Sequence, residues 1–171
     1  MLNEITSCAR SKNNASKHVL VGLSGTALLF ILAAMLTPKY SGLVWMAAFV
    51  FIIASIYVYT RYVGAEYCYG IVEGVARPSF TVGMKVGATA RTMARLDLDS
   101  ITEVKVLTGK EYRAYKCEKG VMKYPYFPTM FPDTVCLVSV RSDYEKADIF
   151  IEADDSFIEA LSSYAQPNFD I

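Results

Sequence analysis

Two apolar stretches decide the fold of this chain: VLVGLSGTALLFILAAMLT from Val19 to Thr37 and YSGLVWMAAFVFIIASIYVYT from Tyr40 to Thr60. They are 19 and 21 residues long, and neither contains a charged residue. As α-helices, which rise about 1.5 Å per residue, they would measure about 28 and 31 Å, close to the roughly 30 Å hydrocarbon core of a bilayer. The sequence therefore predicts two transmembrane helices.

The short link between the two stretches predicts a helical hairpin. Only Pro38 and Lys39 separate them, and Ser41-Gly42 follows. A pair of buried core helices is the alternative, but the rest of the 171-residue chain is too short to cover both helices on every side. Small residues would let the two backbones approach each other in lipid. They are Gly22, Gly25, Thr26, Ala33, Ala34, Ala47, Ala48, Ala54 and Ser55, and the expected interfacial anchors are Tyr40, Tyr57, Tyr59 and Tyr62.

Basic residues near the helix ends predict the orientation of the hairpin, which we place at residues 18–63 after a basic N-terminal segment, 1–17. A signal peptide is disfavoured, because a second apolar stretch follows at once and no A-x-A cleavage site is present. Five Lys/Arg residues flank the outer ends of the hairpin and one lies in its loop, which places both termini in the cytoplasm. The five are Arg10, Lys12, Lys17, Arg61 and Arg77, and the one is Lys39.

Composition excludes several classes of protein. Seventeen Lys+Arg balance seventeen Asp+Glu, so the chain lacks the basic excess of a nucleic-acid-binding domain. The four cysteines, at positions 8, 68, 117 and 136, form no CxxC pair, which argues against a disulfide scaffold and against a zinc ribbon. On a cytoplasmic domain these thiols are expected to be reduced.

Residues 64–171 are expected to form a separate antiparallel β domain, since period-two alternation of apolar and polar residues dominates them. Six strands are predicted, near residues 67–75, 81–87, 90–99, 104–106, 134–140 and 147–153, with a hairpin turn at Gly87-Ala88-Thr89. The expected fold class is α+β: a transmembrane helical hairpin followed by a β barrel or sandwich.

A C-terminal helix is predicted at residues 155–166. Ser156 and Glu159 have the spacing of a capping box, and Pro167 ends the helix. An apolar stripe that includes Phe157 and Leu161 requires a partner, which would be an open end or a face of the sheet.

The hairpin, the segment RLDLDSITEV from Arg95 to Val104 and the ending IFIEADDSFIEAL from Ile149 to Leu161 resemble bacterial membrane proteins that carry a PH-like domain on the cytoplasmic side. The resemblance covers roughly residues 19 to 165, and it implies a multi-pass protein of the bacterial plasma membrane. It implies a seven-stranded barrel with a capping helix, so one further strand is expected within 110–133 or is missing. The basic motif with which eukaryotic PH domains bind phosphoinositides has no counterpart here, so the resemblance implies no headgroup specificity.

No catalytic, cofactor-binding or metal-binding residues are predicted. His18, the only histidine, lies at the start of the first helix, so neither a Ser-His-Asp triad nor an HExxH motif can be assembled in the β domain. Asp97 and Asp99 are expected on one face of a strand as solvated charges. Cys68, Cys117 and Cys136 are expected as ordinary free thiols in the core.

Two neighbouring segments are the candidates for contact with lipid or a partner. The first carries basic residues at positions 110–123, which either contact anionic lipid or form a solvated short helix or loop. The second, YPYFPTMFP at 124–132, combines three prolines with aromatic residues that pack on the domain's own core, enter the membrane interface or dock a partner. The candidate contact residues are Lys110, Arg113, Lys116, Lys119, Lys123, Tyr124, Tyr126, Phe127 and Phe131.

Three functions are compatible with these features. The preferred one is a non-enzymatic, membrane-tethered adaptor that uses the two candidate segments to contact the bilayer, a membrane-protein partner or a second copy of itself. The second is an accessory subunit of a larger membrane complex, recognised through the hairpin. The third is an enzyme that uses buried carboxylates or thiols.

Overall fold

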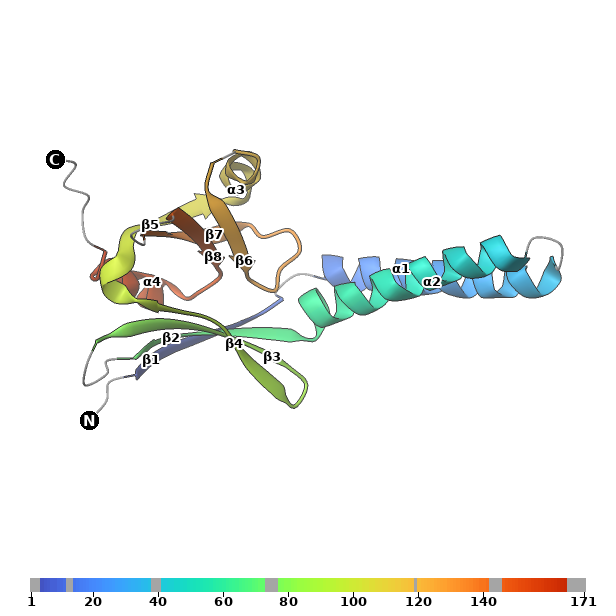
Figure 1. Ribbon diagram of the computed structural model, residues 1–171, viewed down its shortest axis with the longest axis horizontal. Coiled ribbons are helices and arrows are strands. Elements are labelled where there is room, and N and C mark those ends of the chain that lie inside the picture. The colour runs from blue at the N-terminus through green and yellow to red at the C-terminus, as the bar shows by residue number, and fades with distance from the viewer. Residues whose placement is uncertain are drawn as a thin grey trace.

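The computed structural model (Figure 1) describes residues 4–11, 14–37, 41–72, 77–118, 120–141 and 146–165. Two long helices, α1 (Ala15–Leu36) and α2 (Ser41–Val58), pack against each other and project from one end of a β domain. The helix α2 continues as a π-helical turn, η2 (Tyr59–Val63). The expected helical hairpin is confirmed.

Both helices are long and apolar enough to cross a membrane, and the β domain does not cover them. Only 11% of the most apolar 18-residue window of each helix is buried. The helices touch through small residues, since Ala27, Ala34 and Ala48 are buried between them, and the Phe30 and Phe51 rings stack at 5.4 Å. Most of the large apolar side chains of the two helices are exposed, among them Leu29, Met46 and Ile53, which rules out a pair of buried core helices for this structure.

The β domain consists of two four-stranded sheets, so the α+β expectation is confirmed in its sandwich form; the described strands do not close into a barrel. Sheet A has the order β1-β2-β3-β4 and is antiparallel, and sheet B has the order β5-β7-β8-β6. Within sheet B, β6 runs parallel to β8. The strands are β1 (Glu4–Arg10), β2 (Ala65–Val72), β3 (Ser79–Val86), β4 (Thr89–Asp97), β5 (Ile101–Thr108), β6 (Met122–Tyr126), β7 (Thr134–Arg141) and β8 (Lys146–Ile151).

Two of these eight strands are additional to the six that the sequence predicts. The strand β6 lies within 110–133, where the resemblance left a seventh strand open. The strand β1 lies in the N-terminal segment, where no strand is predicted. Because β1 pairs with β2 along its whole length, from Glu4↔Val72 to Arg10↔Glu66, the helical hairpin is an insertion between two neighbouring antiparallel strands. Both helices are therefore joined to the same end of sheet A.

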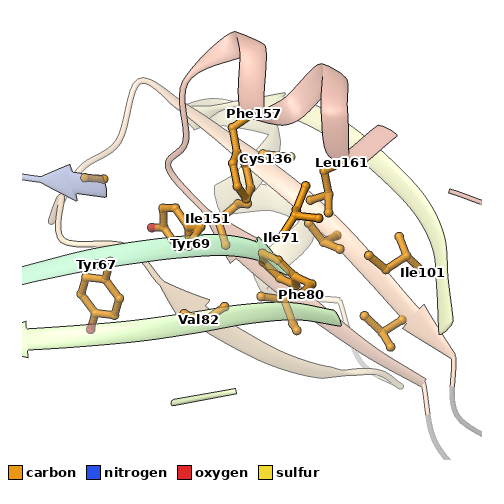
Figure 2. Close-up of a cluster of buried hydrophobic side chains, with 14 of the residues drawn as sticks. Tyr67, Tyr69, Ile71, Phe80, Val82, Ile101, Cys136, Ile151, Phe157 and Leu161 are labelled. Atoms are coloured by element: carbon orange, nitrogen blue, oxygen red, sulfur yellow. The ribbon is translucent and has the colours of Figure 1, made fainter. Parts of the chain in front are cut away.

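The main core lies between the sheets and is closed at one end by the helix α4 (Asp155–Ser162). Figure 2 shows Phe157 and Leu161 of this helix pointing toward side chains of both sheets. The rings of Tyr69 and Phe80 each lie 6.3 Å from that of Phe157. The predicted role of the C-terminal helix is confirmed, although its N-cap is Asp154 and not Ser156; residue 166 lies outside the described residues.

Sheet B is covered on both faces. Residues Cys136, Val138, Ile149 and Ile151 face sheet A, while Val135, Leu137 and Phe150 face a second cluster under the helix α3 (Gly109–Lys116). The ring of Tyr112 on this helix meets the rings of Phe150 at 5.0 Å and Phe127 at 5.5 Å. Burial on both faces explains the unbroken apolar run of β7.

Candidate membrane-facing site

Arg61 connects the end of the hairpin to both sheets. Its Nη1 donates a hydrogen bond to the phenolic oxygen of Tyr67 on β2, and its Nη2 donates to the backbone carbonyl of Pro125 on β6. The guanidinium carbon also lies 5.3 Å from the centre of the Tyr67 ring and 5.9 Å from that of Tyr62. We refer to Arg61, Tyr67 and Pro125 as the junction.

The sequence places each junction residue for a physical reason. Arg61 is the first charged residue after the uncharged stretch that ends at Thr60. It lies four residues before the start of β2, and its side chain contacts the domain. Pro125 has no backbone N–H and lies on β6, an edge strand of sheet B, where proline is tolerated. Tyr67 is fully buried and lies on the same face of β2 as Tyr69, two residues later. The Tyr69 hydroxyl donates to the Tyr126 carbonyl at 2.6 Å. Burial raises the pKa of Tyr69 well above its ordinary value, so this hydroxyl keeps its proton.

A cavity of about 470 Å³ lies beside the junction, between the end of the hairpin and the inner face of sheet A. The helical side contributes Tyr57, Thr60 and Arg61. Strands β3 and β4 contribute Met84, Val86, Thr89, Arg91 and Met93. The lining is mainly apolar and contains two arginines and no acidic residue.

A β-bulge turns Arg91 toward this cavity. Val82 pairs with Ala94, but the next pair is Gly83 with Thr92, so Met93 is the extra residue of β4. Strict period-two alternation along β4 would place Arg91 on the face opposite Ala94 and Leu96. After the bulge, Arg91 pairs with Met84 and shares its face of the sheet, which is the face that carries the core.

The opposite face of sheet A carries a disulfide between Cys8 and Cys68, which corrects the expectation that all four thiols are reduced. The two cysteines are 60 residues apart in sequence and directly opposite in the β1–β2 register. Cys8 is exposed, and Cys68 is partly exposed. Cys136 is a buried free thiol, as expected, whereas Cys117 is free but exposed, so the expectation that it lies in the core is wrong. Burial raises the pKa of the Cys136 thiol to about 12, so it remains protonated at neutral pH.

The basic candidate residues divide into two groups. Lys110, Arg113 and Lys116 lie exposed on α3. Lys123 instead caps the end of that helix: its Nζ donates to the carbonyls of Tyr115 and Glu118 and lies 4.7 Å from the centre of the Tyr115 ring. Lys119 lies outside the described residues.

The aromatic candidate residues also fall into a buried and an exposed group. Phe127 is buried against Tyr112 in the second core cluster, whereas Phe131 is 52% exposed. Tyr124 is 39% exposed and stacks on the partly buried Tyr126 with their ring centres 6.0 Å apart. The segment between β6 and β7, which contains Phe131, and the turn between β3 and β4 extend toward the hairpin end of the domain (Figure 1).

The polar cluster around Asp148 is satisfied internally, whereas the buried hydroxyl of Ser79 has no hydrogen-bond partner among the described residues. The buried carboxylate of Asp148 accepts hydrogen bonds from the hydroxyls of Tyr115 and Ser139, both at 2.8 Å. Asp97 ends β4 and lies 3.8 Å from Arg77, while Asp99 lies in a separate 3-10 turn, so the expectation that they share one strand face is wrong. Among the described residues, no group of three or more His, Cys, Asp or Glu side chains is arranged to hold a metal ion.

Sequence reasoning missed the junction and Arg91. Arg61 contacts Tyr67, six positions later in the sequence, and Pro125, 64 positions later. No local sequence pattern indicates either contact. The position of Arg91 depends on its pairing with β3. No protein-family model, no curated protein and no solved structure matched the chain.

Proposed function

We propose that this chain is a membrane-tethered interaction module: the hairpin crosses the bilayer, and the two-sheet domain, a PH-like domain by its sequence resemblance, binds a membrane-protein partner close to the membrane surface. The observation that carries the proposal is the insertion of the hairpin between β1 and β2. A domain joined to both crossings, and fixed by Arg61 at the second, is held at the bilayer with one end always facing it.

The exposed residues of the two candidate segments supply the contact surface. They are Lys110, Arg113 and Lys116 on α3, with Tyr124 and Phe131 beside it in sequence. Exposed aromatic and arginine side chains are enriched where proteins bind one another. Basic side chains close to an anionic bilayer contribute about 1 kcal/mol each, so the same surface benefits from the tether.

Recovery of partners from detergent-solubilised membranes, followed by mass spectrometry, tests this proposal. The double variant Tyr124→Ser/Phe131→Ser is compared with the wild-type chain and with Val106→Ser, which alters an equally exposed apolar residue on β5. A partner that is recovered with the wild-type chain and Val106→Ser, but depleted with the double variant, is the expected result. Recovery of the chain alone, or equal recovery with all three, would contradict the proposal.

The distribution of Lys and Arg favours the cytoplasmic side for the domain. The Cys8–Cys68 disulfide is compatible with that side if it is reversible, because cytosolic disulfides are mostly transient. Exposure of the pair on the outer face of sheet A makes it accessible to cellular reductants. Alkylation of freshly lysed cells is expected to find these two thiols mainly reduced, and a stably oxidised pair would indicate the opposite side of the membrane.

An accessory subunit recognised through the hairpin is a second candidate, and one observation favours it. Gly22 and Gly25 have no other atoms within 4 Å of the position of a Cβ, so this part of α1 is open to a partner helix. Replacing residues 15–58 with an unrelated two-helix anchor, so that Arg61 is kept, distinguishes the two functions. An adaptor keeps its partner after this exchange, and an intramembrane subunit loses it.

A further inference from the structure

The 470 Å³ cavity beside the junction is placed where a lipid can enter it from the side. If the hairpin spans the bilayer, as the proposed function requires, Arg61 lies at the level of the headgroups, because the uncharged stretch ends at Thr60. Tyr57, exposed to 59%, lines the cavity at the same level. The apolar surface of α2 continues from the cavity into the bilayer through the exposed Ile53 and Ile56.

The chemistry of the lining matches one kind of molecule. Met84, Val86 and Met93 give an apolar wall, and Arg61 and Arg91 supply positive charge without an acidic residue in the lining. Arg91 forms no ion pair with any described residue. A guanidinium group has five N–H donors, so Arg61 keeps donors beyond the two that hold Tyr67 and Pro125. Arginine is well suited to phosphate, which it binds through two parallel hydrogen bonds.

The bulge at Met93 is what creates this arrangement. Without it, Arg91 would face the outer side of sheet A together with Arg95, whose partner Thr81 lies on the outer face. With it, an arginine lies on the face that elsewhere carries the apolar core, at the end of the sheet next to the hairpin. Bulges often redirect a side chain beside a functional site.

We infer that this cavity binds the headgroup of one anionic phospholipid from the surrounding bilayer, with the phosphate on Arg61 and Arg91 and the acyl chains along α2. The volume is within the range of small-molecule sites and accommodates a headgroup with the first carbons of its chains, while the rest of each chain stays in the bilayer. The inference rests on the proposed membrane placement, and it assigns the bound molecule to the lipid phase and not to soluble phosphate.

The test is native mass spectrometry of the full-length chain, released from detergent micelles that contain equal amounts of phosphatidylglycerol and phosphatidylcholine. The wild-type chain is expected to retain one phosphatidylglycerol in preference to phosphatidylcholine. Arg91→Gln is expected to reduce that retention about fivefold, the equivalent of about 1 kcal/mol per basic residue, and Arg91→Lys to restore part of it. Arg95→Gln is the matched control, because it removes the same charge from the other face of the same strand and should change nothing.

Equal retention of the two lipids, or equal losses in Arg91→Gln and Arg95→Gln, would overturn the inference. Displacement of the bound lipid by millimolar glycerol phosphate would also overturn it, because the site would then bind the soluble headgroup. Thermal unfolding of Arg91→Gln checks that the fold is unchanged. Extraction of the chain from membranes by alkaline carbonate would contradict the proposed function itself, so the two failures can be told apart.

Discussion

The two sheets of this domain differ in the burial of their outer faces. Sheet B is buried on both faces, against sheet A on one side and α3 on the other. Sheet A has one face in the core and an outer face open to solvent, and its first two strands are joined to the hairpin. This difference indicates that the outer face of sheet B adds to the stability of the domain, whereas the outer face of sheet A carries the exposed Cys8–Cys68 pair, which a reductant can reach.

The largest expected effect is the loss of an outer-face side chain from sheet B. Phe150→Ala removes a ring that is 1% exposed and that packs on Tyr112 and Tyr115. It should lower the free energy of unfolding by about 3–5 kcal/mol. Arg95→Ala alters an exposed outer-face position of sheet A and should change it by less than about 0.5 kcal/mol. Denaturant titration in detergent measures both, and similar losses would remove the distinction between the sheets.

Arg61→Ala tests the connection between the two sheets and the hairpin. The change leaves the Tyr67 hydroxyl and the Pro125 carbonyl without their charged donor. Hydrogen bonds to charged groups contribute about 1.5–3 kcal/mol, so we expect a loss of about 2–3 kcal/mol in the same titration. Arg77→Ala is the control, because its ion pair with Asp97 is 3.8 Å long and exposed. An effect no larger than that of the control would show that Arg61 does not fix the hairpin to the domain.

Gly109→Ala sharpens the comparison at the edge of sheet B. A Cβ at this position would lie 2.3 Å from the Pro132 carbonyl oxygen, which cannot move without displacing the segment before β7. Alanine is favoured over glycine in a helix by about 1 kcal/mol, yet overpacking costs about 1–3 kcal/mol. We therefore expect a net destabilisation of about 1–2 kcal/mol. Ala114→Gly, at an exposed position of the same helix, reports the propensity effect alone. A stabilised Gly109→Ala chain would mean that α3 and Pro132 are not in contact.

An effect as small as that of Gly109→Ala is expected from sheet A, where Cys8→Ser removes the disulfide. In the chain-entropy description a bridge across about 60 residues stabilises by roughly 4 kcal/mol. Here the residues between Cys8 and Cys68 include the hairpin, which in a bilayer would keep its ends together after the domain unfolds. We therefore expect only about 1–2 kcal/mol, measured as the difference between the oxidised wild-type chain and the variant. A loss near 4 kcal/mol would contradict a persistent hairpin.

Sequence alone predicts the hairpin and α4 well, because each has a long apolar pattern or a periodic stripe that does not depend on a distant partner. It misses β1, whose seven residues EITSCAR are mixed in polarity and gain their partner only after the hairpin has returned the chain to the same place. The Cys8–Cys68 pair is missed for the same reason, since it follows from the β1–β2 register.

The candidate site is predicted only in part. Lys123 and Phe127 are among the candidate contact residues of the basic and aromatic segments. In the structure, Lys123 caps the end of α3, and Phe127 packs in the second core cluster. Arg91 is placed on the wrong face by simple alternation, because one extra residue in β4 inverts the phase of everything before it. Contacts between separate segments of the chain decide each of these cases.

The most direct test of the central claim is the accessibility of two single cysteines in intact cells. In a chain with Cys8, Cys68 and Cys136 changed to serine, the native Cys117 at the end of α3 reports the domain. With Cys117 also changed to serine, Ser41→Cys at the start of α2 reports the turn of the hairpin. A membrane-impermeant maleimide is expected to label Ser41→Cys in intact cells and Cys117 only after lysis. Labelling of both positions from the same side would contradict a hairpin that crosses the bilayer.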